Sequence, residues 1–158
     1  LNSTLSKIHP LKGNFMQPDT ARRYGTVSRA LHWGMAACYC FMFASALAWH
    51  LDDSLRVLIK PHKAVGVLLM LLALVRFLWA LAHYHRRPAN GFAVRAGHLA
   101  LYAMMFAVPA SGMARQMQAR FGNVHGPLAF AFFVLIAGHV AMSVIHQAKG
   151  EAILRRIA

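Results

Sequence analysis

"LHWGMAACYCFMFASALAWH", residues 31–50, is long enough to cross a lipid bilayer as a helix, because about 20 apolar residues span a ~30 Å hydrocarbon core. One histidine stands near its start and another at its end. Three more apolar stretches of similar length follow, at residues 62–82, 98–114 and 125–145. We therefore predict an all-α membrane protein with four transmembrane helices.

The composition supports this class. The chain is 58% hydrophobic and has only four acidic side chains, which lies outside the range of ordinary soluble domains. Its net charge of +13 would favour a nucleic-acid partner if the basic side chains lay along one soluble face. They instead occupy the gaps between the apolar stretches, so we expect a lipid bilayer and no nucleic acid as partner.

The links between the apolar stretches are short and hold most of the remaining polar residues. Such links make neighbouring helices antiparallel, which predicts one up-down bundle over residues 27–158. Residues 1–26 mix Pro, Gly, Ser and Lys, and we predict a poorly ordered tail there. Lys and Arg are concentrated in this tail, in the second link and after the fourth stretch, so both termini are expected to be cytoplasmic.

Six of the ten histidines lie on or at the ends of the predicted helices: His32, His62, His98, His125, His139 and His146. His125 and His139 are fourteen residues apart, which is within about 40° of whole helical turns and a rise of about 21 Å. Both imidazoles therefore face the same side, one near each membrane surface. With the predicted orientation, His62 is level with His125 on the outer side, and His32 is near the level of His139 on the inner side.

Two imidazole pairs at two depths suggest haem. Haem iron accepts two axial ligands from opposite sides of its porphyrin, and the apolar macrocycle fits between membrane helices. We therefore predict two haem b groups, each with bis-histidine ligation. Zinc or copper also binds histidine. Cation or proton transport normally places acids inside the spans, and all four acidic residues lie outside them.

Arg76 lies fourteen residues after His62, so it shares that face and lies close to the inner pair. An unpaired charge at this depth costs up to about 2.5–3.5 kcal/mol. Its expected partner is either a haem propionate or, by snorkelling, the cytoplasmic headgroups. Gly66, one turn after His62, leaves room for a flat macrocycle or for close helix packing. Pro109 and Gly112 either bend the third helix or are ordinary membrane-helix residues.

The ordered set of these segments resembles the prokaryotic cytochrome b561 family over residues 23–158. The matching segments are "RALHW" (29–33), "HKAVGVLLMLLALVRFLW" (62–79), "AGHLALYAMMFAVPASG" (96–112) and "HGPLAFAFFVLIAGHVAMSVIHQ" (125–147). The resemblance implies a di-haem cytochrome of the bacterial inner membrane that exchanges electrons with ubiquinone or another quinone. It also implies His32 and His139 as inner ligands and His62 and His125 as outer ligands, the same pairs that level and face predict.

By the same resemblance, His98 and His146 lie near a cytoplasmic quinone site, with Trp33 beside the inner haem. A protonatable imidazole there can deliver a proton to a reduced quinone; the alternative is that both histidines only bind interfacial water. Some bacterial members resemble superoxide:quinone oxidoreductases. Lys63, with Lys60, Arg115 and Arg120, either attracts a small anion or pairs with haem propionates or lipid phosphates. The alternative function is a haem-bearing membrane-anchor subunit that passes electrons from a partner redox protein to quinone.

Overall fold

The computed structural model describes residues 17–20, 23–83, 91–150 and 157. These residues form four long helices and two short 3-10 helices, and the described ranges contain no strand. The elements in chain order are α1 (Thr26–Leu51), η1 (Asp53–Leu58), α2 (Ile59–Ala82), α3 (Phe92–Gln116), η3 (Arg120–Val124) and α4 (His125–Ala148). The prediction of an all-α fold is confirmed.

The four long helices are the predicted membrane spans. Each is long and apolar enough to cross a bilayer. Large apolar side chains cover much of the outside; Leu71 and Phe130, for example, are 58% and 70% exposed. Exposure of so many large apolar side chains to water is unfavourable, whereas contact with lipid tails is favourable. The described residues thus form an all-α membrane bundle.

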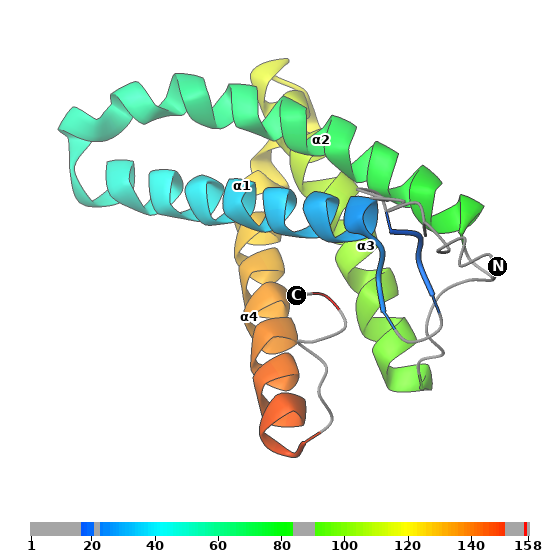
Figure 1. The fold of residues 1–158 in the computed structure, drawn as a ribbon. Coiled ribbons are helices and arrows are strands. Elements are labelled where there is room, and N and C mark those ends of the chain that lie inside the picture. The colour runs from blue at the N-terminus through cyan, green and yellow to red at the C-terminus, as the bar shows by residue number, and fades with distance from the viewer. Residues whose placement is uncertain (1–16, 21–22, 84–90, 151–156, 158) are drawn as a thin grey trace, which may run out of the picture.

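The helices are arranged as two hairpins. α1 and α2 are joined through η1, and α3 and α4 through η3; the two hairpins cross each other in Figure 1. At the crossing, the ring of Phe132 on α4 packs edge-on against Tyr39 on α1, with centroids 5.1 Å apart. All four helices contribute to the buried core, which consists of Met35, Leu69, Ala73, Met105 and Phe132.

Each hairpin has a turn and an open end. We call the turns of the two hairpins, which carry η1 and η3, the loop end. The opposite end, where α1 and α3 begin and α2 and α4 finish, is the terminal end. The up-down order of the helices agrees with the prediction, and which end faces the cytoplasm stays a prediction.

The start of α1 is held by a buried carboxylate. Asp19 is only 5% exposed; one of its oxygens accepts from the Gly25 backbone N–H at 2.6 Å and the other from the Ser28 hydroxyl at 2.9 Å. These bonds satisfy a backbone donor that an uncapped helix start leaves unpaired. The last part of the predicted tail is therefore attached to the helix, while residues 1–16 of that tail lie outside the described residues.

Proline and aspartate shape the helix starts at the loop end. The Asp52 carboxylate accepts from the Ser54 backbone N–H at 2.8 Å, and this hydrogen bond lowers the pKa of Asp52. Pro61 and Pro127 fall in the first turns of α2 and α4, where a backbone N–H has no partner within the helix. Pro109 lies inside α3, which continues past it.

Candidate functional site

The loop end brings His62 and His125 together. His62 lies in the first turn of α2 and His125 is the first residue of α4. The two imidazoles are half-buried and close enough to interact electrostatically. They come from different hairpins, so the pair depends on how the hairpins pack. We call these residues the loop-end pair.

Each ring of the loop-end pair contacts a serine on a neighbouring helix. Nδ1 of His62 lies 2.9 Å from the Ser45 hydroxyl oxygen on α1. Nδ1 of His125 lies 3.0 Å from the Ser111 hydroxyl oxygen and 3.1 Å from the Val108 carbonyl oxygen on α3. In both residues one ring nitrogen is thereby fixed, and Nε2 is left for another partner.

Gly112 makes room for the His125 ring. A Cβ atom at this position would lie 3.0 Å from Cε1 and 3.3 Å from Nδ1 of that imidazole, which is closer than normal packing permits. Room for this ring is a structural reason for a glycine within the third span, where α3 continues from Phe92 to Gln116. A larger residue would push His125 away from its present position.

The terminal end brings His32 and His139 together, with a third imidazole beside them. His32 interacts electrostatically with His139 and with His98. The rings of His98 and His139 lie edge to face, with centroids 5.6 Å apart. The Trp33 ring lies edge-on to His32 at 5.4 Å. We call His32 and His139 the terminal-end pair.

Arg76 lies at the terminal-end pair, as its spacing predicts. Its guanidinium interacts with both His32 and His139. Its Nη1 is 3.4 Å from the Ser28 carbonyl oxygen, which makes a long hydrogen bond. The described ranges, residues 17–20, 23–83, 91–150 and 157, contain no ion pair of Arg76. A half-buried cation with this single weak partner can bind an anionic group.

The other predicted site residues are more dispersed. Lys63 is exposed near the loop end, far along α2 from Arg76. Gly66 faces the terminal methyl of Met42, which would lie 3.5 Å from an added Cβ, an ordinary contact distance that leaves both predicted reasons for this glycine open. Trp33 is 53% exposed, and its Nε1 donates to the Ile157 carbonyl at 3.0 Å.

Sequence reasoning missed Ser45, Ser111 and the steric role of Gly112. It also missed Trp49, whose ring lies edge-on to His62 with centroids 4.9 Å apart. The available signal was a single serine inside the first and inside the third apolar stretch, at positions 45 and 111. Such a hydroxyl also occurs in membrane helices with no partner, so its role needs the neighbouring helix to be placed.

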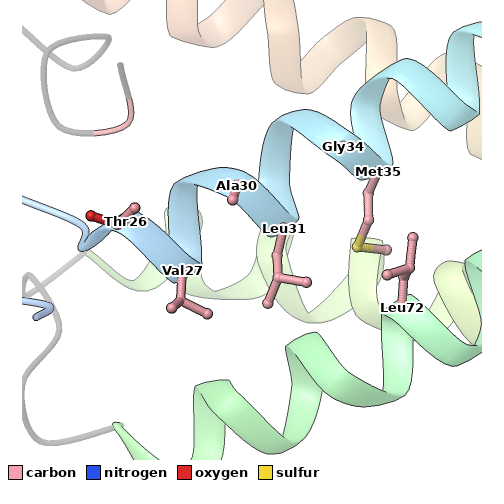
Figure 2. Close-up of a pocket in the computed structure, with 7 residues that line it drawn as sticks. All are labelled: Thr26, Val27, Ala30, Leu31, Gly34, Met35 and Leu72. Carbon is pink, nitrogen blue, oxygen red and sulfur yellow. The ribbon is translucent and has the colours of Figure 1, made fainter. Parts of the chain in front are cut away.

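A pocket of about 350 Å³ lies beside the start of α1 (Figure 2). Its lining is almost entirely apolar and consists of Thr26, Val27, Ala30, Leu31, Gly34, Met35 and Leu72. No predicted ligand or quinone residue lines this pocket. It is therefore separate from the terminal-end pair, although both lie at the same end of α1.

The donor groups fit a porphyrin iron better than a bare metal ion. The described part of the chain holds no cluster of three or more His, Cys, Asp or Glu side chains that could bind a metal, whereas structural zinc needs four ligands. A haem iron needs only two from the protein. An added Cβ at Gly34, Gly126 or Gly138 would meet nothing within 4 Å, so each of these glycines, which stand close to the histidines in the chain, borders open space.

The comparisons with known proteins agree with this geometry. The family model described as prokaryotic cytochrome b561 matches residues 23–158. The chain is also 36% identical over 105 residues to the Escherichia coli (strain K12) protein called cytochrome b561 homolog 2. This match covers 60% of the chain and 55% of that relative, so the chain spans about half the length of the curated relative. The chain therefore belongs to the prokaryotic cytochrome b561 family, whose members bind haem in the membrane and transfer electrons.

Proposed function

We propose that the chain is a di-haem b cytochrome that moves electrons across the bacterial inner membrane to a quinone. The observation that carries the proposal is the presence of one imidazole pair at each end of the bundle. His62 and His125 would hold one haem, and His32 and His139 the other. When bound, each haem supplies an iron that takes up and releases one electron.

The direction of flow in the proposal follows from the predicted orientation. The loop end lies outside, and both termini lie in the cytoplasm. Exposed basic residues at the loop end attract a small anion such as superoxide; they are Lys60, Lys63, Arg115 and Arg120. Each superoxide anion gives one electron and leaves as dioxygen, so two are consumed for each quinone that becomes quinol.

Quinone reduction would take place at the terminal end. A quinone needs two protons as well as two electrons, and a nearby imidazole can supply a proton from the cytoplasmic side. His98 touches the ring of His139, and His146 is in the last turn of α4. Arg76 would hold a propionate of the haem at this end, which would satisfy its charge.

The first test is a reduced-minus-oxidised absorption spectrum of the purified full chain with haem quantified per polypeptide. We expect two haem b groups per chain. Protein that stays colourless after expression with ample haem supply, or that holds a single haem, would contradict the proposal.

The second test is quinol formation by the purified protein in a superoxide-generating system. We expect His98→Ala and His146→Ala to keep both haems and to slow quinone reduction by about 10²-fold, a common effect of losing a proton donor. His50→Ala is the matched control, because the contacts of the His50 ring within the described residues stay on its own helix, with the Ala46 carbonyl and the Trp49 ring. Quinol that forms only after a separate redox protein is added would instead support a haem-bearing membrane-anchor subunit.

A further inference from the structure

Ser45 and Ser111 repeat one arrangement on two helices. The Ser45 hydroxyl donates to the Met42 carbonyl at 3.0 Å, and the Ser111 hydroxyl donates to the Val108 carbonyl at 2.7 Å. Each serine thus bonds the carbonyl three residues before it. Each hydroxyl oxygen also meets Nδ1 of one histidine of the loop-end pair. Both serines are buried, with 2% and 6% exposure.

This arrangement decides which ring nitrogen carries the proton. A hydroxyl group has one hydrogen, and both serines use it on their own helix. Their oxygens can then only accept, so Nδ1 of His62 and of His125 must donate. The Val108 carbonyl oxygen, 3.1 Å from Nδ1 of His125, has no hydrogen and requires the same tautomer. Nε2 of each ring is left with a free lone pair, which is the form that binds a metal.

We propose that Ser45 and Ser111 are positioning residues that hold His62 and His125 as Nδ1–H tautomers and make the loop-end haem the lower-potential haem of the two. This inference rests on the proposed function. It adds a thermodynamic reason for electrons to run from the loop end to the terminal end.

The reason is the electron donation of the ligand. An acceptor on Nδ1–H makes an imidazole a more basic ligand, and a more basic ligand stabilises ferric iron over ferrous iron. The reduction potential therefore falls. In the described ranges, neither ring nitrogen of His32 or His139 has a hydrogen-bond partner of this kind.

Nearby positive charges also make the potential of the terminal-end haem higher than that of the loop-end haem. Reduction removes one unit of positive charge from the iron, so a nearby cation favours the reduced state. The half-buried Arg76 interacts with both histidines of the terminal-end pair. At the loop end, Arg115 interacts with His125, but this side chain is exposed and water and salt screen it more strongly. Arg76 should therefore raise the potential of the terminal-end haem more.

The test is a potentiometric titration of the full haem-loaded protein, followed by optical absorption. His62→Ala leaves only the terminal-end haem, and this identifies which midpoint in the wild type belongs to which haem. We expect Ser45→Ala and Ser111→Ala to shift the loop-end midpoint to more positive values and to leave the other midpoint unchanged. Each histidine keeps a backbone carbonyl as an acceptor when its serine is replaced, Met42 for His62 and Val108 for His125, so the two shifts should be similar in size.

Ser143→Ala is the matched control. Ser143 is on α4 and donates to a backbone carbonyl of its own helix, as the two positioning serines do. The acceptor is the His139 carbonyl at 2.9 Å, so Ser143 contacts the backbone of a terminal-end residue and, among the described residues, neither ring of the loop-end pair. We expect this variant to leave the loop-end midpoint unchanged. Ser45→Cys nearly conserves volume and weakens the acceptor, so it should give a smaller shift of the same sign even if Ser45→Ala loses haem.

The inference is overturned if the serine variants keep both haems with an unchanged loop-end midpoint, or if that midpoint is already the higher one in the wild type. A ferric electron paramagnetic resonance signal from the loop-end haem that changes in Ser45→Ala and Ser45→Cys but not in Ser143→Ala would support it. Failure of the proposed function is distinct, since it appears as fewer than two haems in the wild-type protein.

Discussion

At the loop end, each histidine places Nδ1 against a buried serine hydroxyl, whereas at the terminal end the histidines lie beside Arg76 and a third imidazole. The same side-chain type is thus fixed by short neutral hydrogen bonds in one place and surrounded by ionisable groups in the other. An environment of neutral acceptors orients a ligand and adjusts its basicity. A cation and a third imidazole instead suit a place where an anion and protons must be handled.

The largest expected effect comes from the ligands themselves. His62→Ala or His125→Ala should lower the haem content from two to one per chain and remove the loop-end haem only, because one imidazole cannot complete the axial pair. His32→Ala or His139→Ala should remove the terminal-end haem. Haem quantification with redox titration checks this. His50→Ala should keep both haems, and loss of both from any single ligand variant would show that the two ends are not independent.

A smaller effect is expected from crowding one ligand without removing it. Gly112→Ala places a methyl group 3.0 Å from the His125 ring, and such overpacking typically costs about 1–3 kcal/mol. We expect weaker retention of the loop-end haem and a lower thermal midpoint, measured by haem release and by thermal unfolding in detergent. Gly97→Ala is the control, since its Cβ would meet nothing within 4 Å. Equal effects of the two variants would argue against the steric role.

The smallest effect should come from the charge at the terminal end. Arg76→Gln keeps hydrogen-bonding capacity and removes the positive charge, so the midpoint of the terminal-end haem should fall while the loop-end midpoint stays the same. Spectroelectrochemistry of both variants measures it. Arg56→Gln is the control, because Arg56 pairs with Asp53 on the exposed surface of η1. A shift of the loop-end midpoint instead would mean that Arg76 serves the other haem.

The fold was predictable because it depends mainly on the length and order of the apolar stretches along the chain. Four apolar stretches separated by short links allow little except four antiparallel helices in lipid. The helices extend beyond the predicted runs, with α1 beginning at Thr26 and α3 at Phe92, because polar residues at a membrane surface continue a helix without cost to its backbone bonds. Within the predicted tail, the Asp19 carboxylate contacts the start of α1 by accepting from the Gly25 backbone N–H.

The candidate site was predictable for residues whose shared helix face and depth follow from their spacing along one helix. The fourteen-residue spacing of His125 and His139 fixes one face and two depths, and the same spacing places Arg76 near His32. Spacing within one helix does not reveal contacts with another helix. Gly66, for example, lies next to the terminal methyl of Met42 on α1, and its expected place beside a macrocycle stays a prediction.

The sequence by itself determined the number of helices, their order, and which histidines share a level, because apolar length and helical pitch act along a single chain segment. The tertiary structure alone decided that Ser45 meets His62, that Ser111 and Gly112 frame His125, and that His98 touches His139. These contacts depend on how each helix is rotated about its axis and on how the two hairpins cross, and both are set by side-chain packing around Phe132 and the rest of the core.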